Sequence, residues 1–138
     1  MGTDLQLVFD SFFIKVPSVD FKGKESQVFQ FFKTAIAKCK KHLYDEISYV
    51  YDEDLHEGNF KTLVSDQSIE LISMYMAKEY FTQKYALISG RKQYLGTQAF
   101  NKLPAYKDQF EVVKQSAENW TDEIERFLME FPEYSDER

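Results

Sequence analysis

Two histidines and one cysteine are the residues of this sequence best suited to nucleophilic, acid–base or metal chemistry. They are His42, His56 and Cys39, and their number and spacing do not match the ligand set of a zinc site. Each histidine lies beside charged neighbours, so we expect both to be exposed. Cys39 falls on the apolar side of an expected helix, which predicts a small buried hydrophobic residue rather than a nucleophile. A single cysteine also excludes an internal disulfide.

The acidic, serine and glycine residues do not complete a catalytic pattern either. Asp52 and Asp54 lack the spacing of a calcium-binding loop, because the glycine that would turn such a loop, Gly58, comes too late. The isolated glycines form no phosphate-binding loop, and Ser65 and Ser68 fit helix capping better than nucleophilic attack. The sequence therefore predicts a protein that is not an enzyme, with no catalytic residue, no cofactor and no metal.

Charge is distributed unevenly along the chain. Residues 22–43 hold six lysines and one glutamate, a net charge of +5, whereas residues 44–66 and 111–138 each carry a net charge of −6. The lysines form either a solvated face or a phosphate-binding surface, but the net charge of −6 for the whole chain disfavours a protein that reads duplex DNA. Segments of opposite charge on one molecule suit head-to-tail contacts between copies. Such contacts close into a ring when the rotation from one copy to the next allows it.

Helices must position these charges, and the clearest is predicted over residues 104–131. Its apolar residues recur at gaps of four and three positions in alternation, so they share one face of a helix. They are Tyr106, Phe110, Val113, Ala117, Trp120, Ile124, Phe127 and Phe131. A helix with this stripe is not stable alone in water. The stripe is therefore either covered by other helices of the same chain or partly reserved for another subunit.

Three more helices are expected upstream of this one. Hydrophobic periodicity predicts them over residues 4–16, 24–43 and 66–88, and the third is apolar on nearly all sides, as expected for a central helix. Gly90 is expected to end the third helix, and a short separate piece follows at residues 91–95.

Residues 45–65 form the least regular stretch and are predicted as an exposed loop. Gly58 and Asn59 together are a turn signal. Ile47, Tyr49 and Val50 favour either a short strand or a helical turn, and the sequence does not distinguish the two.

Length and composition indicate a mainly α protein: a small helical bundle of four to five helices with a long C-terminal amphipathic helix. The 138 residues suit one domain, with five glycines and three prolines too few for the turns of an all-β fold. We expect a single helical domain over residues 1–131 and a charged flexible tail over 132–138. No segment reaches the roughly 18 apolar residues of a membrane span and no signal-peptide pattern is present, which predicts a soluble intracellular protein.

Three segments resemble small structural proteins of tailed-bacteriophage neck modules. Residues 94–103, YLGTQAFNKL, are similar to the tight Leu-Gly-Thr corner that precedes a long helix in that family. Residues 65–80 resemble the helix before the corner, and residues 31–40 resemble the family's second helix. The resemblance extends over roughly residues 5–131, but the aromatic cluster at residues 49–51 has no counterpart in the family pattern.

The resemblance implies a non-catalytic head–tail connector, or adaptor, that forms a homo-oligomeric ring beneath the portal in the virion neck. Such rings commonly contain twelve subunits, and a terminal segment docks on the portal. The expected partners are the portal protein, other neck and tail proteins and further copies of the chain. DNA would pass through without specific binding, no membrane would be involved, and assembly would occur in the host cytoplasm.

The charge pattern and the end of the last helix supply the candidate interface residues. They are Lys38, Lys40, Lys41, Glu123, Phe127, Phe131 and Tyr134. The last two would act as aromatic anchors on a partner. The alternative function is a small intracellular helical regulatory protein that binds a protein or nucleic-acid partner.

Overall fold

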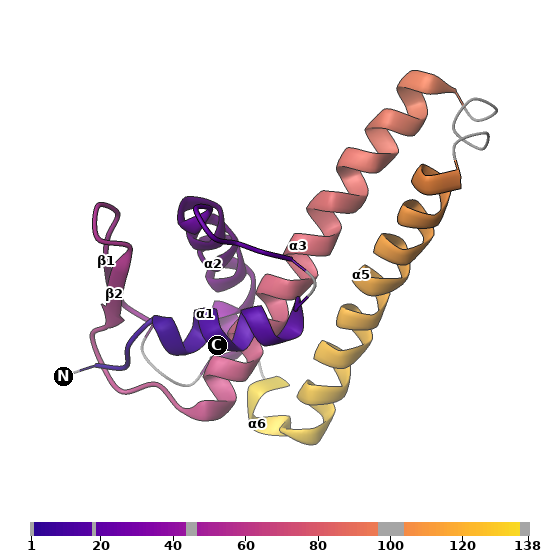
Figure 1. Ribbon diagram of the computed structural model, residues 1–138. Helices are drawn as coiled ribbons and strands as arrows, with labels where there is room; N and C mark the ends of the chain where they lie inside the picture. The colour runs from indigo at the N-terminus through magenta and orange to yellow at the C-terminus, as the bar shows by residue number, and fades with distance from the viewer. Residues whose placement is uncertain (1, 18, 44–46, 97–103, 136–138) are drawn as a thin grey trace.

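A long helical hairpin projects from a body of shorter elements in the computed structural model of this chain (Figure 1). The structure describes residues 2–17, 19–43, 47–96 and 104–135. Its elements are α1 (Gln6–Lys15), α2 (Glu25–Cys39), a 3-10 helix η1 (Lys40–His42), β1 (Tyr49–Asp52), β2 (Glu57–Phe60), α3 (Asp66–Leu95), α5 (Pro104–Glu130) and α6 (Pro132–Ser135). The mainly α fold and the long amphipathic helix near the C-terminus are confirmed.

The body is built around the first half of α3. Helices α1 and α2 both pack against α3, and its residues Leu71, Ile72 and Met76 are fully buried there. The apolar periodicity of α2 places its rings and aliphatic side chains in the same core, and each expected member of that face is buried: Val28, Phe29, Phe32, Ala35, Ile36, Cys39 and Leu43. The expected central position of the third helix is thus confirmed.

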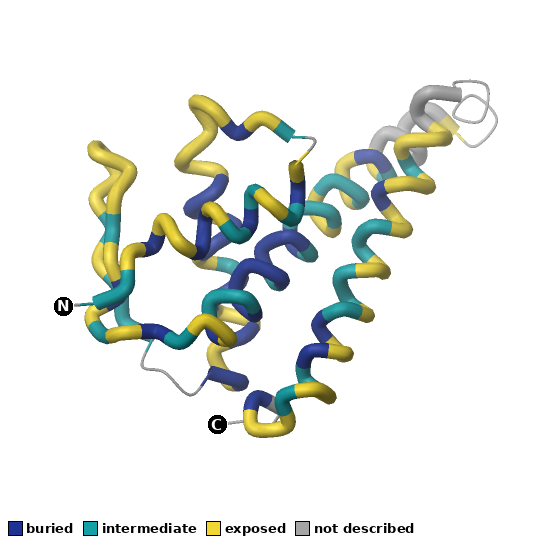
Figure 2. The backbone as a smooth tube through the Cα atoms, turned by 60° about the horizontal axis from the view of Figure 1, so that its bottom comes forward, coloured by how far each residue is buried: buried dark blue, intermediate teal, exposed yellow. Residues whose placement is uncertain are grey.

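The arm is formed by the second half of α3 and the first half of α5, which run antiparallel (Figure 1). At a rise of about 1.5 Å per residue, each of the two helices is roughly 40–45 Å long. The outer part of the arm has a small core of its own, in which Ile88 and Val113 are buried between Phe81, Tyr85 and Phe110. Figure 2 shows that burial on α5 is confined to one side of the helix.

Gly90 does not end the third helix, contrary to the prediction. Helix α3 continues through Gly90 to Leu95, so the separate piece expected at residues 91–95 is its last part, and Gly96 follows with φ of 81°. Glycine costs a helix interior only about 1 kcal/mol relative to alanine, and packing against α5 outweighs that cost. Of the corner at 94–103, residues 97–103 lie outside the described residues.

The predicted loop after α2 contains a two-stranded antiparallel hairpin, and the strand alternative is the correct one for Tyr49 and Val50. The turn prediction at Gly58 and Asn59 is wrong, because both residues lie in β2, where Gly58 pairs with Tyr51. The reversal occurs before them, where the backbone amides of Asp54 and Leu55 donate to Oδ1 of Asp52 at 2.9 and 3.1 Å.

The N-terminal segment packs along the hairpin. The backbone amide of Phe60 donates to the carbonyl of Thr3 at 2.8 Å, and that of Leu5 donates to the carbonyl of Gly58 at 3.0 Å. A β-carbon on Gly58 would lie 2.4 Å from the carbonyl oxygen of Val50 and 2.9 Å from Cδ1 of Leu5. Glycine is therefore needed at this position for close approach between elements rather than for a turn.

Contrary to the prediction, the chain does not become a flexible tail at residue 132. Pro132–Ser135 forms the short helix α6, and Tyr134 is 5% exposed. The Tyr134 ring packs edge-on against Phe127, with ring centroids 5.7 Å apart, and its hydroxyl lies 3.0 Å from Oγ of Ser65. Residues 136–138 of the predicted tail lie outside the described residues.

Candidate functional site

Four lysines of α2 and η1 form what we call the basic surface: Lys33, Lys38, Lys40 and Lys41, all of them exposed. They do not have equal roles. Nζ of Lys38 lies 2.7 Å from Oε2 of Glu79, a carboxylate of α3 whose side chain is only 12% exposed. Lys38 therefore compensates a nearly buried charge of its own fold. Lys40 and Lys41 lie on η1, the short helix that follows α2.

A groove with a volume of about 360 Å³ lies between the first turns of α3 and the last turns of α5. We call it the acidic groove. Its walls carry four carboxylates and one guanidinium, above a floor of apolar side chains, and it is lined by Asp66, Gln67, Glu70, Met74, Glu123, Arg126, Phe127, Glu130 and Phe131. The groove thus brings together three of the predicted interface residues, namely Glu123, Phe127 and Phe131.

Two ion pairs reduce the negative charge of the acidic groove without removing it. Nη1 of Arg126 lies 2.6 Å from Oε1 of Glu123, and Nζ of Lys15 lies 3.0 Å from Oε2 of Glu70. Within the described part of the chain, no ion pair involves Asp66 or Glu130. The groove therefore keeps a net negative charge beside the rings of Phe127 and Phe131.

Tyr134, the remaining predicted anchor, does not line the acidic groove. Its hydroxyl lies within hydrogen-bond distance of both serines at the start of α3, at 3.0 Å from Ser65 and 3.3 Å from Ser68. The backbone amide of Ser68 also donates to Oγ of Ser65 at 3.2 Å, which confirms Ser65 as the N-cap of this helix. Tyr134 therefore holds α6 against α3. Because its side chain is buried there, it is not the free aromatic anchor for a partner that the sequence predicted.

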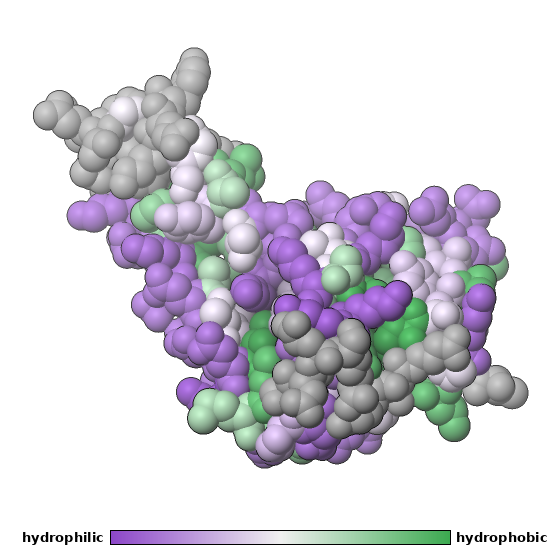
Figure 3. Space-filling model, turned by 180° about the vertical axis from the view of Figure 1, so that it is seen from behind, coloured by the Kyte–Doolittle hydropathy of each residue, from purple (hydrophilic) through white to green (hydrophobic). Residues whose placement is uncertain are grey.

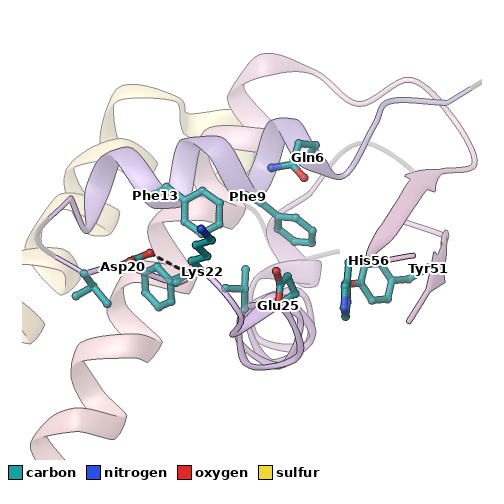
Figure 4. Close-up of a pocket in the computed structure, with 11 residues that line it drawn as sticks. Gln6, Phe9, Phe13, Asp20, Lys22, Glu25, Tyr51 and His56 are labelled. Atoms are coloured by element: carbon teal, nitrogen blue, oxygen red, sulfur yellow. Dashed lines mark hydrogen bonds between the residues drawn. The ribbon is translucent and has the colours of Figure 1, made fainter. Parts of the chain in front are cut away.

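A second concavity, which we call the aromatic pocket, lies between α1, the start of α2 and the hairpin (Figure 4). Its volume is about 430 Å³. Rings make its floor and walls, polar side chains make its rim, and it is lined by Gln6, Phe9, Phe13, Val19, Asp20, Phe21, Lys22, Glu25, Val28, Tyr51 and His56. Phe13 and Phe21 are stacked with ring centroids 5.6 Å apart, and Phe9 meets Tyr51 edge-on at 6.4 Å.

The electrostatic environment of the aromatic pocket is negative on its hairpin side. Burial raises the pKa of Tyr51, and the nearby carboxylates of Glu25 and Glu53 raise this pKa further.

Sequence reasoning missed this pocket, because its residues come from four segments with no common spacing. The one available signal was the aromatic cluster at residues 49–51, which had no counterpart in the family pattern.

Of the three residues first considered for chemistry, two are buried and one lies at the rim of the aromatic pocket. Cys39 is fully buried, and burial raises the pKa of its thiol to about 12. His42 is 8% exposed, so its predicted exposure is wrong, and its Nδ1 has no hydrogen-bond partner among the described residues. His56 is exposed, as expected, and lies at the rim of the aromatic pocket with φ of 55°.

Neither a metal site nor a membrane span is found in the described ranges. No three histidine, cysteine, aspartate or glutamate side chains in those ranges are grouped so that they could hold a metal ion. No helix there combines the length and apolar character that crossing a membrane requires. No protein-family model matches the chain, and no curated protein or solved structure matches it either.

Proposed function

We propose that this chain is a non-catalytic structural protein that acts by assembling with further copies of itself and with other proteins. Following the resemblance to neck proteins, the assembly we propose is the head–tail connector ring beneath the portal of a tailed bacteriophage. The virion neck would then be its final location.

The observation that carries the proposal is the one-sided cover of α5. Among the elements that the structure describes, and apart from the short α6, the long helix packs substantially only against α3. Its stripe is consequently half-buried at Phe110, Ala117, Trp120 and Phe131. Figure 3 shows apolar surface between the arm and the body, with hydrophilic surface beside it on the arm. Apolar helix surface that its own chain leaves half-covered favours packing against a neighbour.

The distribution of charge indicates which two surfaces meet in the proposed contact. No residue of α2 or η1 lines the acidic groove, so the basic surface and the groove are separate parts of the molecule. A lysine pair from one copy placed at the carboxylates of the next gives a head-to-tail contact, and such contacts close into rings at the right rotation. Complementary charge would speed and orient the encounter, while apolar contacts along α5 would supply most of the affinity.

Sedimentation velocity across a salt series tests the proposal. We expect the protein to self-associate with increasing concentration, and this association to weaken as salt screens the exposed charges. The variant Lys40→Glu/Lys41→Glu should weaken it further, and Lys38 is left unchanged because of its pair with Glu79. The matched control is Lys24→Glu/Lys61→Glu, which alters the charge equally at exposed positions outside α5, the basic surface and the acidic groove.

Negative-stain imaging of the protein mixed with portal protein tests the specific assembly. Rings seated on the portal are the expected result. A protein that stays monomeric at high concentration and adds nothing to the portal would overturn the proposal. Retention on nucleic acid that the Lys40→Glu/Lys41→Glu change abolishes would instead support the regulatory alternative.

A further inference from the structure

The aromatic pocket has the composition of a site for an organic cation, and this inference does not depend on the assembly proposed above. Its floor consists of the buried rings of Phe9 and Phe21, and its walls include the half-buried rings of Phe13 and Tyr51. Aromatic faces attract an ammonium or guanidinium group, and the attraction is stronger when water is excluded. A volume of about 430 Å³ suits a group of this size attached to a short apolar chain.

Carboxylates lie at the rim of the aromatic pocket, where they can pair with the charge of a bound cation. Asp20 and Glu25 line the pocket, and the hairpin beside it carries Asp52, Glu53, Asp54 and Glu57 without a lysine between them. In Figure 4 the Glu25 side chain rises from the first turn of α2 toward the space between Phe9 and Tyr51. Within the described part of the chain, no ion pair or side-chain hydrogen bond involves the Glu25 carboxylate.

Lys22 also lines the pocket, and its positive charge opposes the binding of a cation. Its backbone amide donates to Oδ1 of Asp20 at 2.9 Å, which fixes the main chain and leaves the exposed side chain free to rotate into solvent. The rim therefore holds two carboxylates, those of Asp20 and Glu25, that should favour a cationic ligand and one lysine that should oppose it.

We propose that the aromatic pocket binds an organic cation: an ammonium or guanidinium group at the end of a short apolar chain. The rings contact the cation and its apolar chain, and Glu25 pairs with the charge at the rim. The same chemistry is available from a free small molecule or from an arginine or lysine side chain of a partner protein.

Nuclear magnetic resonance titration of the full chain tests this proposal with three probes. They are n-butylguanidinium, its neutral counterpart n-butylurea, and a capped Gly-Gly-Arg-Gly-Gly peptide. We expect the guanidinium to shift resonances of Phe13 and Tyr51 at saturable concentrations and the urea to bind at least fivefold more weakly. Peptide binding as tight as that of butylguanidinium would assign the site to a partner's side chain, and binding of butylguanidinium alone would assign it to a small molecule.

Two variants with opposite expected effects make the test specific. Glu25→Gln should weaken butylguanidinium binding about threefold to fivefold, and Lys22→Gln should strengthen it about twofold to threefold. Glu118→Gln, at an exposed position of α5, is the matched control and should change nothing. Equal binding of urea and guanidinium, no binding of either cation probe, or no difference between the Glu25 and Lys22 variants would each overturn the proposal. Both positions are exposed, so the folded state should survive either change, and the native spectrum checks this.

Discussion

Single residues in this protein differ sharply in how much room the fold leaves them, and two glycines illustrate it. Gly58 lies where the hairpin meets α1, with backbone and side-chain atoms inside the space of a β-carbon. Gly90 lies in α3, with nothing within 4 Å of the position a β-carbon would take. The same substitution should therefore have opposite effects at the two positions.

Gly58→Ala should destabilise the protein by about 1–3 kcal/mol, because the new methyl group must displace the Val50 carbonyl or Leu5. Gly90→Ala should stabilise it by about 0.5–1 kcal/mol, because alanine loses less backbone entropy in a helix. Urea denaturation of the two variants and the original chain measures both changes. A harmless Gly58→Ala change would contradict the described packing of the hairpin against α1.

Cys39 should behave as a core residue and not as a nucleophile. Burial raises the pKa of its thiol to about 12, and the thiolate is the reactive form. Iodoacetamide at pH 8 should therefore label Cys39 only after the chain is unfolded. Rapid labelling of the native protein would show that this part of the core is open.

The raised pKa of Cys39 also predicts the direction of a pH effect on stability. The unfolded chain ionises this thiol near pH 8.5, whereas the folded chain keeps the proton until about pH 12. The stabilisation is thus complete below about pH 8.5 and is lost as the pH rises toward 12. The free energy of unfolding should fall between pH 8 and 10.5, and by less in Cys39→Ala.

At the scale of elements, the helices were predictable and their ends and partners were less so. The apolar faces of α2 and α5 repeat every three or four residues, so local spacing alone defined them. The end of α3 was not predictable from Gly90, since the gain from packing on α5 comes from residues far along the chain. The second strand of the hairpin was missed for a related reason: Gly58 resembles a turn residue locally, and only the distant Leu5 explains it.

Helix α6 shows how a polar contact can order a terminal segment. The Tyr134 hydroxyl lies in hydrogen-bond range of Ser65 and Ser68, so Tyr134→Phe should destabilise the protein by about 0.5–1.5 kcal/mol. Faster hydrogen exchange confined to α6 and the first turn of α3 should accompany the loss. Tyr49→Phe is the control, because the Tyr49 hydroxyl bonds none of the residues that the structure describes.

If Tyr134→Phe leaves both the stability and the exchange rates unchanged, the aromatic contacts of Tyr134 with Phe127 and Phe131 hold α6 without help from the hydroxyl. That result would show that the Tyr134 hydroxyl does not stabilise α6. It would leave the packing of the rings in place.

At the scale of the whole molecule, charge segregation was visible in the sequence, but its placement was not. Three predicted interface residues meet in the acidic groove because α3 and α5 lie side by side, whereas Lys38 and Tyr134 serve the fold itself. Spacing along a helix shows which residues share a face. It does not show which of them a distant carboxylate or serine has already engaged.

The central claim is that the basic surface of one copy contacts the acidic groove of the next, and an exchange of charges tests it most directly. Lys40→Glu/Lys41→Glu makes the first surface acidic, and Glu123→Lys/Glu130→Lys makes the groove basic. Each double variant alone should sediment as a monomer at concentrations where the original chain associates. An equimolar mixture of the two should associate again, because each surface then meets its opposite charge on the other variant. A mixture that remains monomeric while the original chain associates would contradict the claim.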